Sequence, residues 1–300
     1  SQMKRFRILV SGALLMTLAG TPLPAQLSAE LEAVDAIIES EDADAAISRL
    51  EALESRATGS DAAEVYWRLA QATLMLGDQR EVAGAGEDEL LAIYERGERY
   101  GEQAIDADPG NNLGYYWTSA NVGRWGQTQG VLNSLFRAPD MRDLLTESVN
   151  LDPDHADSYY VLGQLYAQVP GVILFGNVEY AVSLGRKAVD LMEAELAAGE
   201  REELNEDFYI QLASHLISRD WNRRRRARNM GDIRQSYQNA GTPIERGFFY
   251  EGSASVRDGE DAAEAREILD EVIDRLEGIG NRSPSENRRL EEALELREAM

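Results

Sequence analysis

Apolar residues recur along most of the chain at the spacing of an α-helix. Leu31, Val34, Ile37 and Ile38, for example, would share one face of a helix. No segment of the sequence shows the sustained alternation of apolar and polar residues that is typical of strands. Glycine and proline residues interrupt the helical pattern at intervals. We therefore expect an all-α protein built from about a dozen short, antiparallel helices.

A second pattern repeats on a longer scale and is similar to the tetratricopeptide repeat. That repeat has aromatic, leucine and small residues on its first helix and small residues on its second, so that the two helices approach closely. The best match comprises Tyr159, Leu162, Gly163, Tyr166, Ala181 and Ala188. Asp-Pro turns at Pro109 and Pro153 mark the ends of two further repeats. The sequence thus predicts a tetratricopeptide-like helix-pair solenoid, with its best repeats at residues 61–191.

The spacing within the repeats departs from the tetratricopeptide pattern. Three consecutive repeats have more residues than the pattern requires between the positions held by Ala70 and Gly97, by Ala120 and Met141, and by Gly163 and Ala181. We therefore expect enlarged intra-repeat turns that emerge on one edge of the solenoid. Two of the inserted segments, residues 123–136 and 169–176, are apolar and glycine-rich, so we expect them to rim and cover a shared cavity.

The composition argues against several classes of function. With 54 acidic and 30 basic residues, the formal net charge is -24, which disfavours binding to nucleic-acid phosphates or anionic lipid. The chain has no cysteine, and therefore no disulfide, thiolate metal site, catalytic cysteine or lipidated N-terminal cysteine. Its two histidines cannot form a histidine-rich metal site, and the sequence contains no catalytic or nucleotide-binding motif. We therefore expect neither a cofactor nor enzymatic activity.

Residues 1–25 have the features of a secretory signal peptide. A basic start is followed by an apolar run at residues 8–19 and by a cleavage site at residues 23–25. The apolar run is shorter than a helix that crosses a bilayer. The sequence thus predicts a periplasmic protein that is exported by a cleaved signal peptide, is not lipidated, and has a single helical-repeat domain at residues 26–300.

Three stretches carry a resemblance to a known family: residues 101–109 (GEQAIDADP), 115–126 (YYWTSANVGRWG) and 160–170 (YVLGQLYAQVP). With them, the run from residue 94 to residue 191 resembles the T component of tripartite ATP-independent periplasmic (TRAP) transporters, a family of degenerate tetratricopeptide pairs. The resemblance implies a helper that docks on the transporter's periplasmic solute-binding component and encloses an apolar pore for a hydrophobic small molecule. A related pattern occurs in eukaryotic regulators of microtubule dynamics, but the signal peptide favours the bacterial family.

Aromatic residues in the same region form the candidate ligand wall. The candidates are Tyr116, Trp117, Trp125, Tyr160 and Phe175. Tyr159 and Tyr166, in contrast, hold core positions of the tetratricopeptide register. Asn121 and Arg124 would share a helix face with Trp117, so this polar pair could orient a ligand carboxylate. The alternatives are that the aromatic residues only fill the core and that solvent satisfies the polar pair.

Two functional hypotheses follow. The first is a periplasmic accessory protein of a TRAP-type transporter, which binds a hydrophobic or amphipathic small molecule in an internal cavity and docks on the solute-binding component. The alternative is a protein-protein adaptor of the cell envelope that has no small-molecule ligand. Self-association of the chain is left open. We expect the four arginines at residues 223–226 to pair with acidic residues, within the chain or across a subunit contact.

Overall fold

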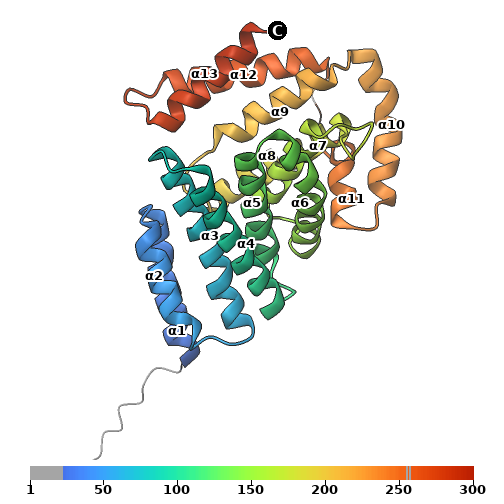
Figure 1. Cartoon of the computed structure of the whole chain (residues 1–300). Helices are drawn as coiled ribbons and strands as arrows, with labels where there is room; N and C mark the ends of the chain where they lie inside the picture. The colour runs from blue at the N-terminus through green and yellow to red at the C-terminus, as the bar shows by residue number, and fades with distance from the viewer. Residues whose placement is uncertain (1–22, 255, 257) are drawn as a thin grey trace, which may run out of the picture.

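The computed structural model describes residues 23–254, 256 and 258–300, which form an all-helical structure (Figure 1). The described part contains thirteen α-helices, one short 3-10 helix and no strand. In chain order the elements are α1 (Leu23–Glu39), α2 (Ala43–Glu54), α3 (Ser60–Val82), α4 (Glu87–Ala107), α5 (Asn112–Gln129), α6 (Val131–Leu151), α7 (Ala156–Gln168), α8 (Val178–Ala198), α9 (Glu206–Arg219), α10 (Arg223–Asn239), α11 (Pro243–Phe248), η1 (Tyr250–Gly252), α12 (Asp261–Glu277) and α13 (Pro284–Glu298). The expected all-α class is confirmed.

The predicted signal peptide lies almost entirely outside the described residues, because the structure begins at Leu23 in the first turn of α1. Export and cleavage therefore stay predictions. Among the helices that the structure does describe, none is both long enough and apolar enough to cross a membrane.

Consecutive helices pack against each other in antiparallel pairs. Along the contact between α4 and α5, Gly97 faces Asn121 and Gly101 faces Thr118, so residue numbers rise on one helix as they fall on the other. Glycine is needed at both positions: a Cβ atom at Gly97 would lie 2.0 Å from Asn121 Oδ1, and one at Gly101 would lie 2.1 Å from Thr118 Oγ1. Figure 1 shows α3, α4, α5 and α6 side by side. This arrangement is the predicted tetratricopeptide-like helix-pair solenoid.

The extra residues within the repeats are accommodated in two different ways. In the first two pairs they lengthen the helices, so that α3 has 23 residues and α4 and α6 have 21 each. The connectors stay short, at residues 83–86 between α3 and α4 and at Gly130 alone between α5 and α6. Only the third pair, α7 and α8, has a long connector, residues 169–177. The expectation of enlarged turns is wrong for the first two pairs, because α5 adds turns until Gly130, with a φ of 95°, ends it.

The hydrophobic core has two parts. One cluster joins α1, α2 and α3 and includes the fully buried Leu50 and Leu69. The larger cluster joins α6, α7, α8 and α9 with α11, α12 and α13, and it contains Tyr159, Leu162 and Tyr166 from α7. These three residues hold first-helix positions of the tetratricopeptide register, so their predicted place in the core is confirmed.

A second kind of interior, made of charged side chains, joins the C-terminal helices. Its members, here called the ion cluster, are Arg186, Arg219, Arg226, Glu251, Asp261 and Glu264. All six side chains are buried, and they come from α8, α9, α10, η1 and α12. Arg219 Nε lies 2.7 Å from Asp261 Oδ2, and Arg226 Nε lies 2.6 Å from the other oxygen of the same carboxylate. Of the four arginines at residues 223–226, the expected pairing with acidic residues of the chain is confirmed for Arg223, Arg225 and Arg226.

The ion cluster keeps the carboxylate of Glu264 ionised. Burial by itself would raise the pKa of Glu264, but hydrogen bonds and positive charge from Arg186 and Arg226 outweigh burial and lower that pKa to about 2. Because every charge in the cluster has partners of opposite sign, removing one member would leave the others buried and incompletely paired. The cluster therefore holds four α-helices and η1 in one fixed arrangement.

Candidate functional site: an uncharged pocket between α5, α6 and α7

A pocket of about 300 Å³ lies between α5, α6 and α7. This space is here called the α5–α7 pocket. It is lined by Val122, Gly123, Gly126, Gln127, Ser134, Leu135, Ala138, Met141, Val161, Gln164, Leu165, Gln168 and Val169. None of these side chains is ionisable, although 28% of the residues in the chain are charged. Sites for small molecules are concave, largely apolar, and typically begin at about this volume. The pocket is therefore the candidate binding site.

Small residues let α5 and α6 approach each other closely beside this pocket. Gly126 of α5 lies against Ser134 of α6, where a Cβ atom on the glycine would be 3.1 Å from the Ser134 Cα. One turn earlier, a Cβ atom on Gly123 would come within 2.7 Å of the Met141 methyl group. The two helices therefore meet closely near Gly130, and the larger side chains of Leu135 and Met141 help to form the walls.

The polar groups at the pocket are amides and a hydroxyl. Gln164 Nε2 donates a hydrogen bond to the Tyr160 hydroxyl at 3.1 Å, and Gln127 Oε1 accepts one from Arg124 at 2.8 Å. The side chains of Gln168 and Ser134 make no hydrogen bond to any other described residue, so both can serve a bound molecule. No ionisable side chain lies in the pocket walls, so the polar contacts that they offer a bound molecule are hydrogen bonds.

The polar pair predicted to orient a ligand carboxylate is used inside the fold. Asn121 is fully buried, and its Nδ2 donates to the backbone oxygens of Ala70 at 3.1 Å and Trp117 at 2.9 Å. Arg124 forms ion pairs with Asp78 at 2.8 Å and with a second acid of α3, and its Nη1 donates to the pocket residue Gln127. The interpretation of this pair as a carboxylate clamp is therefore corrected: it ties α5 to α3.

The five predicted aromatic residues are also outside the pocket walls, and they do not gather at one place. On α5, the ring of Tyr116 contacts those of Trp117, at 4.9 Å, and His155, at 4.8 Å between ring centres. Trp125 Nε1 donates to Glu95 Oε1 of α4 at 3.1 Å. Tyr116 thus contacts the start of α7, whereas Trp125 contacts α4.

The remaining two aromatics contact further elements. Tyr160 stacks on Phe208 of α9 with 4.5 Å between ring centres. Phe175, in the connector between α7 and α8, makes an edge contact with Tyr166 at 5.2 Å, and the Arg142 guanidinium lies 4.8 Å from its ring centre. Each of these contacts joins one helix or connector to another, so the aromatic residues do not form a single ligand wall.

The inserted segments were a better guide to the pocket than the aromatic residues. Gly123, Gly126, Ser134 and Leu135 belong to the first of them, and Val169 begins the second. The α7 side of the pocket, with its two glutamines, was missed. The only sequence signal for it is the i, i+4 spacing of two polar residues on a helix that otherwise packs in the core.

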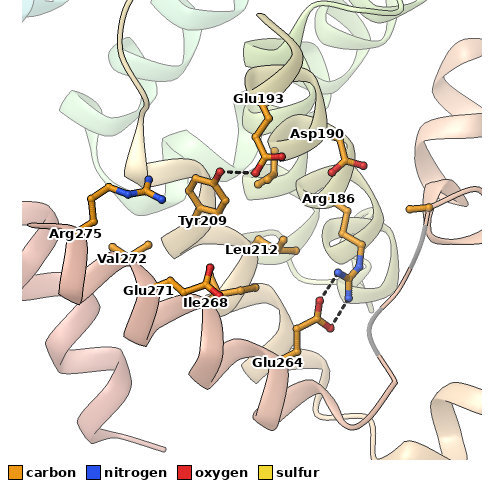
Figure 2. Close-up of a pocket in the computed structure, with 12 residues that line it drawn as sticks. Arg186, Asp190, Glu193, Tyr209, Leu212, Glu264, Ile268, Glu271, Val272 and Arg275 are labelled. Atoms are coloured by element: carbon orange, nitrogen blue, oxygen red, sulfur yellow. Dashed lines mark hydrogen bonds and ion pairs between the residues drawn. The ribbon is translucent and has the colours of Figure 1, made fainter. Parts of the chain in front are cut away.

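A second pocket, of about 400 Å³, lies between α8, α9 and α12 (Figure 2). At one end Arg186 forms a bidentate pair with Glu264, and at the other the Tyr209 hydroxyl donates to Glu193 Oε1 at 2.5 Å. The Arg275 guanidinium lies 5.7 Å from the centre of the Tyr209 ring. Arg186 and Glu264 bind each other and belong to the ion cluster, and the Asp190 carboxylate accepts from the Tyr250 hydroxyl. No group of three or more ligating side chains among the described residues could hold a metal ion.

The fold thus defines an all-α, helix-pair repeat protein. The family model described as Regulator of microtubule dynamics protein 1-3 matches residues 31–172, a range that includes all residues of the α5–α7 pocket. A solved structure of TTC0263, a thermophilic TPR protein in Thermus thermophilus, has 14% sequence identity and a TM-score of 0.47 over 76% of this chain and 98% of that chain. No curated protein sequence matches the chain.

Proposed function

We propose that this protein is a non-enzymatic binding protein that holds the apolar part of a small amphipathic molecule in the α5–α7 pocket. The observation that carries the proposal is a pocket of about 300 Å³, lined by three helices, with apolar side chains on each of them. Leu135 and Met141 of α6 face Val161 and Leu165 of α7 across this space. An apolar chain inserted there would replace water against these side chains, which favours binding.

We further propose that the protein acts in the periplasm as an accessory of a TRAP-type transporter and passes its ligand to or from the solute-binding component. The resemblance of residues 94–191 supports this role, because that run contains the whole α5–α7 pocket. The predicted signal peptide supports the location. The acidic surface, at a formal net charge of -24, favours a partner with a basic docking face.

The binding proposal is tested with N-phenyl-1-naphthylamine, an uncharged apolar fluorophore, titrated against the purified protein. We expect saturable binding to the wild type and loss of binding in Ala138→Phe, which places a large ring in the pocket wall. Ala263→Phe is the matched control, because Ala263 lies on α12, away from the pocket. Thermal unfolding of each variant shows that it is folded. Absent binding to the wild type, or undiminished binding to Ala138→Phe, would overturn the proposal.

A second candidate is a protein-protein adaptor that has no small-molecule ligand. The family model that matches residues 31–172 favours this candidate, because it is described as a regulator of microtubule dynamics and such a protein acts on other proteins. The same experiment separates the two candidates. An adaptor predicts no bound fluorophore, and the partner it captures should be retained equally by wild type and by Ala138→Phe.

A further inference from the structure

We propose that the α5–α7 pocket selects uncharged amphiphiles, such as long-chain or isoprenoid alcohols, over fatty acids of the same chain length. This inference rests on the proposed function and names its ligand class. Two observations support it. None of the thirteen residues that line the pocket is charged, and the chain as a whole is strongly acidic. A ligand that brought its own charge into this pocket would find no opposite charge to balance it.

The arginines on the helices of the pocket are committed elsewhere. Helices α5, α6 and α7 contain three arginines and no lysine, namely Arg124, Arg137 and Arg142. None of the three lines the pocket. Their acidic partners are, in the same order, Asp78 with Glu81, Glu98 with Asp140, and Asp143. A carboxylate entering the pocket would have to compete with these acids for the arginines and, at Arg124 Nη1, with the Gln127 amide oxygen that accepts from it at 2.8 Å.

The electrostatics outside the pocket act in the same direction. A formal net charge of -24 repels anions as they approach. Inside, a carboxylate would lose its hydration and gain only hydrogen bonds from amides and a hydroxyl, which do not compensate for the lost hydration of a full charge. Both steps therefore disfavour a fatty acid relative to the alcohol of equal length.

The polar groups that are present suit a hydroxyl or carbonyl oxygen. Gln164 and Gln168 lie four residues apart on the same face of α7, and Ser134 lines the pocket from α6. A carboxamide both donates and accepts hydrogen bonds, and so does a serine hydroxyl. The Gln168 amide and the Ser134 hydroxyl have no partner in the part of the chain that the structure describes, so they can satisfy a ligand hydroxyl, which also donates and accepts. Neither group needs to become charged.

The selectivity is tested by displacing N-phenyl-1-naphthylamine with 1-dodecanol or with dodecanoate, at about pH 7, where the fatty acid is ionised. For the wild type we expect the alcohol to bind at least about tenfold more tightly than the carboxylate. In Gln168→Arg, which adds a cation to the pocket wall, we expect the preference to shrink or reverse. Gln168→Met is the matched control, because it removes the amide without adding charge and should keep the preference for the alcohol.

The outcomes separate the two proposals. Equal or tighter binding of dodecanoate to the wild type overturns the selectivity and leaves the binding function standing. An unchanged preference in Gln168→Arg, in protein that unfolds at the wild-type temperature, also overturns the electrostatic basis of the selectivity. If neither ligand nor the fluorophore binds the wild type, the binding function and the selectivity fail together.

Discussion

The α5–α7 pocket and the ion cluster are two solutions to the problem of joining three or more helices. Between α5, α6 and α7 the helices meet through glycine and serine and leave an uncharged space. Among α8, α9, α10, η1 and α12, six buried charges fill the interior. A charge network fixes its helices because each member needs all of its partners. An uncharged space sets no such requirement, so its walls can accept a ligand without breaking a pair.

The comparison extends to how the N-terminal helices are tied together. At the junction of α3, α4 and α5 the polar side chain at the centre is a buried amide, Asn121, instead of a set of charges. Its donors bind backbone oxygens of α3 and α5. Gly97 of α4 gives that amide its space. In the N-terminal half the ion pairs, such as that of Arg124 with Asp78, lie partly exposed, whereas the C-terminal half buries a network of charges beside its apolar core.

The largest effect should come from breaking the ion cluster. We expect Arg219→Met to lower the free energy of unfolding by about 3–5 kcal/mol, because it leaves Glu251 and Asp261 buried with one partner fewer. Urea unfolding measures this loss. Arg223→Met is the control: Arg223 pairs with Asp258 at the surface, so its replacement should leave the midpoint unchanged. A loss no greater than that of the control would show that the cluster does not hold the C-terminal helices.

The stability of the C-terminal half should also depend on pH, through the charge of the buried His215. Burial lowers the pKa of His215 to about 4, from 6.5. Between these values the unfolded chain binds a proton that the folded chain does not, so stability falls as pH falls from 6.5 to about 4, by about 3 kcal/mol at most. Glu264 has a folded pKa of about 2, so its contribution to stability is present above pH 4.5 and is lost as the pH falls from 4.5 toward 2.

The measurement is urea unfolding as a function of pH, in the wild type and in His215→Gln, which does not titrate. We expect the variant to lose less stability than the wild type between pH 6.5 and 4. Parallel curves for the two proteins would mean that His215 is hydrated in the folded state. His215 and the buried Gln211, one turn earlier on α9, both have side-chain nitrogen atoms without a hydrogen-bond partner among the described residues. Protonation of His215 should therefore have a clear effect on the free energy of unfolding.

Local spacing predicted the helices and the repeat register, and the structure confirms Tyr159, Leu162 and Tyr166 as core residues. The ends of two repeats were also predictable, because α4 and α6 each end one residue before the Asp of an Asp-Pro turn. These features depend on residues within one or two turns of one another, which a sequence pattern contains directly.

The role of Arg124 was not predictable in this way. Its partners Asp78 and Glu81 precede it by 46 and 43 residues, and they meet it only after α3 and α5 have packed. The same applies to the aromatic candidates: Tyr160 meets Phe208 of α9, and Trp125 meets Glu95 of α4. Residue type and local spacing place such side chains on a helix face, but the helix that covers this face is decided by tertiary packing.

The close helix contact of the N-terminal half can be tested at Gly97. We expect Gly97→Ala to destabilise the protein by about 1–3 kcal/mol, because its methyl group would lie 2.0 Å from Asn121 Oδ1 and the buried amide would lose hydrogen bonds by moving. Gly231→Ala is the matched control, since Gly231 lies in α10 with open space around it. That change should stabilise the protein by about 0.5–1 kcal/mol. Equal signs for the two variants would refute the close contact.

The smallest effect is expected at the connector between α7 and α8, where the apolar residues predicted to cover a cavity point in part to solvent. Ile173 is 76% exposed, whereas Val169, at the start of the same connector, is 6% exposed and lines the α5–α7 pocket. Ile173→Ser should therefore change the free energy of unfolding by less than about 0.5 kcal/mol, and Val169→Ser should lower it by about 1–3 kcal/mol. Urea unfolding of both variants measures the difference. If Ile173→Ser cost as much as Val169→Ser, the connector would close over the pocket in solution, and the uncharged space would be a covered cavity instead of an open one.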